Sequence, residues 1–392
     1  MSAPACPVCG GGAAERVVSL ADQPVLIGVL WDDAEAARAC RRGDIDLTFC
    51  PDCGFLWNPA FDPARIAYDR RYDNSLHFSP TFQSYSQGLV DRLVETYGLR
   101  HKTVVDIGCG KGDFLAMLCE AGPNRGYGFD PAYEGDRVST EAAGRITWST
   151  EHFGEAHAAL PADLIASRFV YEHIPEPQAF LAMLRRSIAD PARTVIFFEV
   201  PDADLIVRQF SVWDLIYEHC SYFSVESLSR SFAAAGFDVL RLEETYGRQF
   251  LTVEARPAAA APGDPGPATG DLERLRADVA AFRERVAARI GEWTARLEGW
   301  RREGRRVAAW GAGAKAVGFL NMLQDRAVID RVVDINPHKR GKHLAGTGQR
   351  IVAPADLAAD PPDIVVVMNP VYRDEIAADL AGRGLTPELV AA

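Results

Sequence analysis

The sequence predicts an α/β protein with two doubly wound sheets and a small cysteine-rich lobe ahead of them. A short apolar run from Thr103 to Ile107 is followed by three closely spaced glycines and then by an apolar helix pattern. A second run ends in the glycine turn Trp310-Gly-Ala-Gly313, and two Cys-x-x-Cys-Gly motifs precede both runs. A buried strand that leads through a glycine turn into a helix is typical of a doubly wound sheet. The sequence therefore predicts two nucleotide-type folds in one chain.

The first glycine turn is Asp106-Ile-Gly-Cys-Gly-Lys-Gly112, and the next strand ends in Asp130. Asp130 lies 18 residues beyond Gly112 (130 − 112), so its carboxylate is expected at the tip of the neighbouring strand, where it can accept both hydroxyls of a ribose. The turn resembles motif I of the class I methyltransferases, a Rossmann-like family that binds S-adenosylmethionine. This resemblance implies a class I methyltransferase core and the following cofactor-binding residues: Asp106, Gly108, Gly110, Gly112, Asp130 and Ser167.

A nicotinamide-binding fold can use a similar turn. It fits less well, because Lys111 and Asp113 would crowd a turn that has to face a pyrophosphate. The segment after this core closes with two runs, 237–243 and 249–254, that are typical of an antiparallel strand pair. A parallel sheet that ends in a reversed strand is the class I methyltransferase order.

Composition excludes several classes of protein. The 392 residues carry a formal net charge of −12, whereas a general nucleic-acid binder usually shows a basic face. No apolar run reaches the roughly 18 residues that a membrane span needs, and no signal peptide is visible at the N-terminus. Eight cysteines, four of them in two close pairs, fit metal binding in a reducing compartment better than a disulfide framework. We expect a cytoplasmic monomer or dimer that acts on a small molecule, with no nucleic-acid or membrane partner.

Composition and periodicity divide the chain into five segments. Residues 257–270 are rich in proline, alanine and glycine, as in a linker. Apolar residues then recur every three or four positions from Leu272 to Trp300, which predicts a long amphipathic helix. This helix either braces the lobes or forms a coiled-coil dimer contact. The expected segments are a zinc-binding lobe at 1–80, a methyltransferase domain at 81–257, a linker at 258–270, a bracing helix at 271–304 and a C-terminal Rossmann-like domain at 305–392.

The two cysteine motifs predict a structural zinc site. Each Cys-x-x-Cys turn can point two thiolates at one ion, and the glycine after it tolerates the positive φ that the turn needs. Four thiolates leave no open position for a substrate. A redox pair is the alternative, but neither motif lies between a strand and a helix. The expected Zn²⁺ ligands are Cys6, Cys9, Cys50 and Cys53, whereas Cys40 fits no ligand spacing.

Two Tyr-Glu-His triplets, 171–173 and 217–219, follow strands of the expected sheet. Ligands bind outside the carboxyl ends of such strands, so both triplets can overhang the cofactor pocket. A histidine there can take a proton near neutral pH. For His173 the competing hypothesis is the start of the next helix, and for His219 it is a structural histidine.

The whole chain resembles the nucleotide-sugar C-methyltransferases of deoxysugar biosynthesis. The shared features are a four-cysteine N-terminal lobe, a methyltransferase core, and a C-terminal domain that begins Trp-Gly-Ala-Gly-Ala-Lys after a long helix. The resemblance implies a thymidine diphosphate-linked 4-keto sugar held between the last two domains. It also implies that a histidine in a Tyr-His-Glu-His-x-Ser-Tyr motif removes the proton beside the ketone, and that the resulting enolate attacks the methyl group.

Matching the family's motif to this chain implies four catalytic residues. His219 is the base and Glu218 is its neighbour, whereas Tyr217 and His173 stabilise the enolate oxygen. Tyr222 is expected to line the sugar site. Two departures mark a divergent branch. The motif here is Tyr217-Glu-His-Cys-Ser-Tyr222, which lacks the histidine between Tyr and Glu, and motif I has the general class I form.

Apart from the resemblance, Tyr72 lies in an aromatic segment after the second cysteine motif, and it is expected to bind the substrate and to form a lid over the methyl donor together with His77. Alternatively, the rings of this segment pack the zinc lobe against its neighbour.

Basic residues near the second glycine turn indicate, independently of the resemblance, a site for a diphosphate. Lys315 and its basic neighbours suit a diphosphate, although a solvated basic loop explains them equally well. Asp334 lies 21 residues beyond Gly313 (334 − 313), which also fits a nicotinamide ribose. The competing functions are therefore an O-methyltransferase, a C-methyltransferase of another small molecule, and a nicotinamide-dependent oxidoreductase. A binding protein with a decayed catalytic domain is disfavoured by the intact turn and Asp130.

Overall fold

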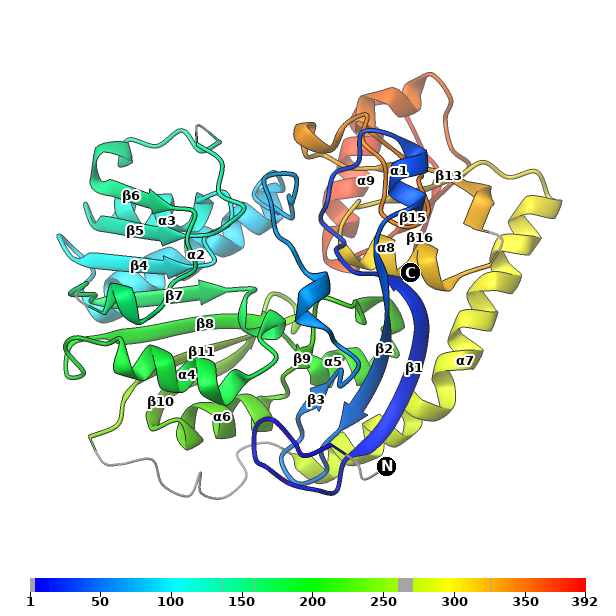
Figure 1. The fold of residues 1–392 in the computed structure, drawn as a ribbon. Coiled ribbons are helices and arrows are strands. Elements are labelled where there is room, and N and C mark those ends of the chain that lie inside the picture. Colours follow the sequence, from blue (N-terminus) through cyan, green and yellow to red (C-terminus); the bar gives the residue numbers. More distant parts are fainter. Residues whose placement is uncertain (1–3, 136, 159, 260–270, 325) are drawn as a thin grey trace.

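A computed structural model describes residues 4–135, 137–158, 160–259, 271–324 and 326–392, which form three sheets (Figure 1). Most of the expected linker, 260–270, lies outside the described residues. The central sheet has the order β10-β11-β8-β7-β4-β5-β6. Its strands are β4 Thr103–Ile107, β5 Arg125–Phe129, β6 Ile146–Ser149, β7 Leu164–Arg168, β8 Val195–Pro201, β10 Phe237–Thr245 and β11 Phe250–Pro257.

Five strands of the central sheet are parallel, and β11 runs antiparallel between β8 and β10. This is the order expected of a class I methyltransferase, and the predicted fold class is confirmed. The strand order changes direction at β4, where β5 lies on one side and β7 on the other. The carboxyl ends of these strands therefore form the crevice in which such sheets bind ligands.

Helices cover both faces of the central sheet (Figure 1). Alternate strand residues supply the two cores, because successive side chains of a strand point to opposite faces. Val104 packs with α2 and α3, whereas its neighbour Val105 packs with α4 and α6. The helices of this domain are α2 Pro80–Tyr97, α3 Asp113–Ala121, α4 Pro177–Arg186, α5 Ala203–Arg208 and α6 Val225–Ala234.

The N-terminal sheet has the order β1-β2-β3-β9 and is not confined to the first 80 residues. Its last strand, β9, comes from the second His triplet region and pairs with β3. The N-terminal lobe is thus joined by strand pairing to the segment that carries His219. The elements are β1 Glu15–Pro24, α1 Ala34–Arg38, β2 Arg42–Phe49, β3 Leu56–Trp57 and β9 Ser221–Tyr222.

The C-terminal sheet is entirely parallel, in the order β14-β13-β12-β15-β16. The long helix α7, Leu272–Arg302, runs along the molecule from the N-terminal lobe to this domain (Figure 1). Its apolar face, including Phe282 and Trp293, is buried in a core shared with β1, α5 and the C-terminal domain, which accounts for its bracing position. The remaining elements are β12 Val307–Trp310, α8 Ala314–Met322, β13 Ile329–Val333, β14 Arg350–Val352, β15 Ile364–Val367, α9 Arg373–Gly382 and β16 Glu388–Ala391.

Among the described residues, no helix combines the length and apolar character that a membrane crossing requires.

Candidate active site

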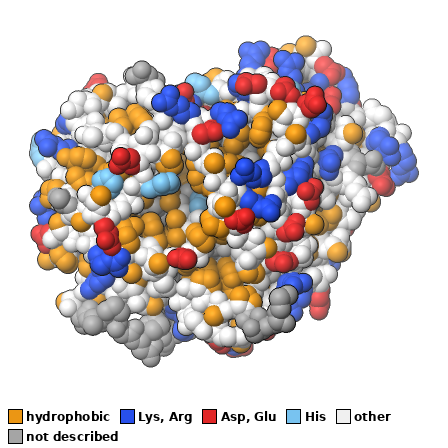
Figure 2. All heavy atoms as spheres, viewed as in Figure 1, with side chains coloured by type: hydrophobic (Ala, Val, Ile, Leu, Met, Phe, Trp, Pro, Cys, Tyr) orange, Lys and Arg blue, Asp and Glu red, His pale blue; other side chains and the backbone are white. Residues whose placement is uncertain are grey.

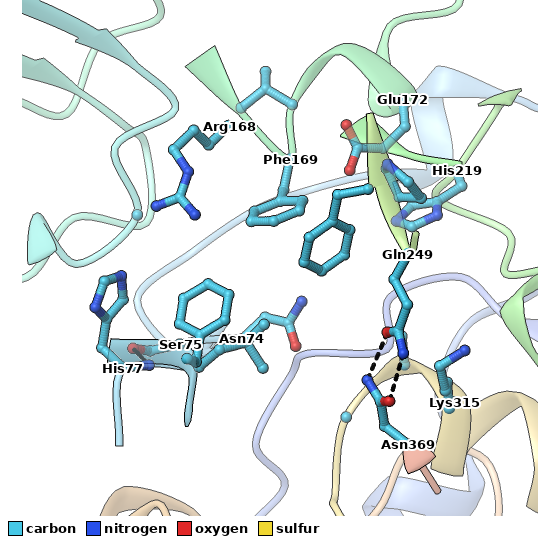
Figure 3. A pocket seen from close by; sticks show the side chains of 18 of the residues that line it. Asn74, Ser75, His77, Arg168, Phe169, Glu172, His219, Gln249, Lys315 and Asn369 are labelled. Atoms are coloured by element: carbon cyan, nitrogen blue, oxygen red, sulfur yellow. Dashed lines mark hydrogen bonds between the residues drawn. The ribbon is translucent and has the colours of Figure 1, made fainter. Parts of the chain in front are cut away.

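A cavity of about 910 Å³ opens between the methyltransferase domain and the C-terminal domain. Its lining comes from the first glycine turn, the segment from Tyr68 to Ser79, the two His triplets and the second glycine turn. On the face shown in Figure 2, hydrophobic and histidine side chains gather between the two domains. Gln249 and Asn369 exchange two amide hydrogen bonds of 2.8 Å across the cavity wall (Figure 3). This amide pair joins the two domains and was not predicted from the sequence.

The first glycine turn forms one end of the cavity. Gly108 and Gly110 both have positive φ, and a Cβ on Gly108 would lie 2.2 Å from Val170. The amides of Gly110 and Ala132 donate to the Asp130 carboxylate at 2.8 and 2.7 Å, which fixes that carboxylate at the end of β5. Asp106 is buried beside them, and burial raises its pKa to about 7. The turn, the two acids and the space in front of them fit the ribose and the ammonium group of S-adenosylmethionine.

Two of the expected cofactor residues lie outside the cavity lining. Gly112 has φ of 101° and a Cβ there would lie 2.5 Å from Trp148, so this glycine serves the packing of α3 against β6. Ser167 donates to the backbone oxygen of Ile107 at 3.1 Å and is buried between strands. The residues that line the cavity at this strand end are Arg168 and Phe169.

We expect Asp130→Asn to weaken S-adenosylmethionine binding by roughly 10- to 100-fold, because a hydrogen bond to a charged group contributes about 1.5–3 kcal/mol. The affinity is measured by isothermal titration calorimetry. Asp334→Asn is the matched control, since Asp334 accepts from the Ala312 amide at 2.8 Å in the second glycine turn. Equal losses in both variants, or none in either, would show that the first turn does not hold the ribose.

His219, His173 and Glu172 form the polar cluster of the cavity wall. One ligand atom from each lies within 4.8 Å of the others, and the two imidazole rings meet edge to face with centroids 4.8 Å apart. Figure 3 shows Glu172 and His219 on the same wall. Burial and the neighbouring His173 hold the pKa of His219 well below its usual value, so the ring is neutral near pH 7. Among the described residues, neither ring nitrogen of His219 takes part in a hydrogen bond, which leaves the ring free to act on a ligand.

His173 lies in a single 3₁₀ turn after β7 and not in the next helix, which begins at Pro177. Its Nδ1 lies 3.0 Å from the backbone oxygen of Glu218, and since a carbonyl can only accept, Nδ1 carries the proton. Burial lowers the pKa of His173 to about 4. The neutral ring therefore presents a lone pair at Nε2. It cannot donate a hydrogen bond to an enolate oxygen, which corrects the role carried over to His173.

Glu218 lies behind the histidines and does not line the cavity. Its carboxylate accepts from the Ile27 amide at 2.9 Å and from the Tyr68 hydroxyl at 3.1 Å, and burial raises its pKa to about 7. Glu218 thus ties the His219 segment to the N-terminal lobe. Tyr68, which also contacts His173 Nδ1 at 3.0 Å, lines the cavity and was missed from the sequence, where it stood in an aromatic segment without a motif.

Two tyrosines expected at the site point elsewhere. The Tyr217 hydroxyl accepts from the Asp62 amide at 2.8 Å, and its ring packs over Gly43 in the N-terminal lobe. The Tyr222 hydroxyl is bonded to the backbone of Ile216, and its ring is buried next to His219. Neither residue lines the cavity, so neither can contact an enolate or a sugar. Tyr222 instead supports the loop that holds His219.

Tyr72 and Lys315 do line the cavity. Lys315 forms an ion pair with Asp214, another lining residue. The expected basic cluster does not gather around the glycine turn, because four of its nine members pair with acids on the surface. The nine are Arg305, Arg306, Lys315, His338, Lys339, Arg340, Lys342, His343 and Arg350. The four pairs are Arg305 with Glu388, Arg306 with Asp363, Arg340 with Asp356 and Lys342 with Asp32. Lys315 and Lys339 are the lysines of this cluster that reach the cavity, and Lys339 is bonded to Ala312 and Asp334.

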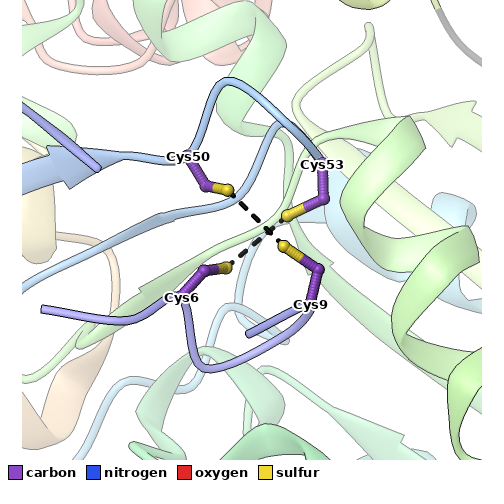
Figure 4. Close-up of side chains that lie close together, drawn as sticks. All are labelled: Cys6, Cys9, Cys50 and Cys53. Atoms are coloured by element: carbon purple, nitrogen blue, oxygen red, sulfur yellow. Dashed lines mark hydrogen bonds between the residues drawn. The ribbon is translucent and has the colours of Figure 1, made fainter. Parts of the chain in front are cut away.

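The four expected zinc ligands converge in the N-terminal lobe (Figure 4). Their Sγ atoms lie within 4.8 Å of one another, and the pairs Cys6–Cys53 and Cys9–Cys50 are each 3.6 Å apart. A tetrahedron with Zn–S bonds of ~2.3 Å has edges of ~3.8 Å, so the donor set fits one ion. Gly10 and Gly54, which follow the two Cys-x-x-Cys turns, both have positive φ, as expected. Cys40 lies outside this group.

Comparison with known proteins agrees with this architecture. Residues 77–242 match a family model described as a methyltransferase domain, and residues 272–384 match one described as a C-methyltransferase C-terminal domain. C-methyltransferase NovU of Streptomyces niveus is 28% identical over 95% of this chain and 90% of its own length. Trans-aconitate 2-methyltransferase of Azoarcus sp. (strain BH72) is 33% identical over 22% of this chain and 34% of its own.

Solved structures contribute less. The magnesium protoporphyrin IX methyltransferase of Synechocystis PCC 6803, with bound S-adenosylmethionine, covers 45% of this chain and 80% of its own at 18% identity, and its TM-score of 0.32 carries no weight. The expectation of an oxidoreductase finds no support, since both domains match methyltransferase models. The chain is therefore an S-adenosylmethionine-dependent methyltransferase in which a methyltransferase domain is followed by a domain that matches the C-terminal domain of C-methyltransferases.

Proposed function

We propose that this enzyme methylates a carbon atom next to the ketone of a nucleotide-linked 4-keto deoxysugar, with His219 as the base that forms the enolate. One observation carries the proposal. The cavity has the first glycine turn at one end and the C-terminal domain at the other, and His219 lies in its wall with a neutral, unbonded imidazole. The similarity to C-methyltransferase NovU over nearly the whole chain supports methylation at carbon rather than oxygen.

The chemistry follows from the acidity of a carbon beside a ketone. S-adenosylmethionine, when bound by Asp106, Gly108, Gly110 and Asp130, supplies an electrophilic methyl group. His219 takes the proton from the carbon, and the carbonyl oxygen receives the negative charge. A positioned base contributes typically 10²–10⁴-fold to such a step. Glu218 and Tyr222 hold the loop that presents His219, and burial, with a smaller contribution from His173, lowers the pKa of His219, so the base is unprotonated at neutral pH.

The C-terminal side of the cavity suits the remainder of the substrate. Lys315 and Tyr72 line the same cavity as His219, and Lys315 supplies a cation for a diphosphate. The ion pair with Asp214 holds the ammonium group in place before substrate arrives. An O-methyltransferase would need no base beside an acidic carbon.

Incubation with S-adenosylmethionine and a panel of 4-keto nucleotide sugars tests this function. We expect one product heavier by a methyl group, together with deuterium incorporation from heavy water at the neighbouring carbon, both read by mass spectrometry. The matched 4-hydroxy sugars should remain unchanged, because they lack the acidic carbon. Methylation of the 4-hydroxy sugars would instead identify an O-methyltransferase and reject the enolate.

We also propose that Cys6, Cys9, Cys50 and Cys53 bind one structural Zn²⁺. The four thiols fit a tetrahedral ion, and Cys6, Cys50 and Cys53 are buried. The cluster packs into the same core as Phe223 and Phe198 of the methyltransferase domain, so the ion would hold a lobe against the catalytic domain and take no part in the reaction.

A further inference from the structure

Glu172 is a buried carboxyl group that the mechanism above does not use. It lines the cavity, its side chain is 2% exposed, and neither carboxylate oxygen has a hydrogen-bond partner among the described residues. Leaving a buried polar group without a partner costs about 1–3 kcal/mol, more if it is charged. Such a group at the wall of a ligand cavity indicates that the ligand provides the missing partner.

In the proposed reaction, His219 takes a proton from the substrate carbon next to the ketone. The position of Glu172 suits a contact with the oxygen of that ketone. The two side chains offer atoms within 4.8 Å of each other, so they can address adjacent atoms of one substrate. The two residues expected to donate hydrogen bonds to that oxygen, Tyr217 and His173, cannot do so. Tyr217 points to Asp62, and His173 presents a lone pair.

We infer that Glu172 is a catalytic residue that acts as a neutral carboxylic acid and donates a hydrogen bond to the ketone oxygen as the enolate forms. This inference rests on the proposed function. The C–H bond breaks and its proton goes to His219, its electron pair becomes the C=C bond, and the carbonyl π pair moves to the oxygen that Glu172 faces. No proton needs to leave Glu172 in this step. A donor aimed at developing charge in a water-poor site is worth roughly 10²–10³ in rate.

The surroundings of Glu172 keep it neutral. Burial raises its pKa well above the usual value, and the carboxylates of Glu199 and Glu218 add to the rise. The other titratable groups near it are neutral at pH 7: His173 and His219 have lowered pKa values, and burial raises that of Cys220 to about 12. A carboxylic acid kept neutral in an apolar site is a known way to obtain a strong donor.

The test is exchange of the sugar's acidic proton with heavy water, followed by NMR without added S-adenosylmethionine and again with S-adenosylhomocysteine. We expect Glu172→Leu to slow exchange by roughly 10²–10³-fold. Glu172→Gln keeps a donor and should exchange at least about tenfold faster than Glu172→Leu. If Glu172 acted as a carboxylate, by stabilising an imidazolium, the Gln variant would be as slow as the Leu variant, and the inference would be overturned.

The pH profile gives a second readout. Because the donor is the protonated acid, exchange by the natural enzyme should fall as the pH rises through the Glu172 pKa, and Glu172→Gln should lack that fall. Asp202→Asn is the control, since Asp202 also lines the cavity and burial raises its pKa to about 8. A fall that disappears in Asp202→Asn, but persists in Glu172→Gln, would contradict the assignment.

Other outcomes separate this inference from the function beneath it. If the natural enzyme exchanges and methylates a 4-keto sugar while both Glu172 variants match it, the inference alone fails. If the natural enzyme does neither, the proposed function fails as well. If a chelator abolishes exchange and a divalent cation restores it, with zinc content unchanged, then Glu172, His173 and His219 hold a metal and Glu172 is not a donor. Cofactor affinity and zinc content show whether each variant is folded.

Discussion

Replacing His219 by alanine is expected to lower turnover by roughly 10²–10⁴-fold and to leave the affinity for S-adenosylmethionine unchanged. The loss follows because the neutral imidazole of His219 lines the cavity and has no hydrogen-bond partner among the described residues, so it is available to take the proton. The carboxyl group of Glu172, which also lacks such a partner, lies beside it. Cofactor affinity should persist because the glycine turn and Asp130 lie on other elements. Single-turnover methyl transfer, followed by mass spectrometry, gives the rate, and calorimetry gives the affinity.

The pH dependence of kcat/KM should report the protonation of His219. The base must be unprotonated, and burial together with His173 lowers the pKa of His219 well below 6.5. Activity should therefore stay level as the pH falls from neutrality through 6.5, and decline when the pH reaches the lowered pKa. His101→Asn is the control, because His101 is exposed at the opposite end of β4 with a positive φ that asparagine tolerates. Normal turnover by His219→Ala, or an acid limb centred on 6.5, would show that another group is the base.

The first glycine turn could be predicted from the sequence because its information is local. An apolar run of five residues forms β4 as expected, and the glycines that follow it need positive φ, which other residues rarely adopt. Asp130 was also placed correctly at a strand end, since one short strand and one helix fix its distance along the chain. The four cysteines converge for a similar reason, because two identical turns carry their own geometry.

The direction of single side chains could not be predicted. Ser167 and Arg168 are neighbours on β7, and successive strand residues point to opposite sides, so an error of one position exchanges a lining residue for a buried one. Tyr217 shows a longer-range cause. Its orientation depends on the pairing of β9 with β3 and on the Asp62 amide, which lies 155 residues earlier in the chain. Neither contact can be predicted from the sequence around Tyr217.

Glu172 was visible in the first Tyr-Glu-His triplet, yet the sequence offered no reason to prefer it to His173. The distinction arises from hydrogen bonds, because the backbone oxygen of Glu218 engages His173 while Glu172 is left without a partner. The basic residues near the second glycine turn show the converse. Their composition suggested one cation-rich site, but acids from other segments pair with four of the nine at the surface.

Cys50→Ser is expected to remove zinc from the protein and to destabilise the N-terminal lobe by several kcal/mol, since structural zinc sites bind with apparent free energies of roughly 10–16 kcal/mol. The effect should reach the active site. The second cysteine turn packs on Phe223 through Phe55, with ring centroids 5.1 Å apart. Just beyond it, β3 pairs with β9, and the Asn58 amide donates to the Cys220 carbonyl at 2.9 Å, one residue from His219. Loss of zinc should therefore reduce turnover as well as stability.

Elemental analysis gives the zinc content, and hydrogen exchange at β2 and β3 gives the local stability, which is better defined here than one melting temperature because the chain has several domains. Cys40→Ser is the matched control, because Cys40 is also buried in the N-terminal lobe but lies outside the cluster, and this variant should keep its zinc and its protection. If the two variants behave alike, the ion does not hold the lobe. If Cys50→Ser loses zinc and protection yet turns over normally, the link from the cysteine cluster through β3 and β9 to His219 is wrong, and the lobe is stabilised by zinc without supporting the base.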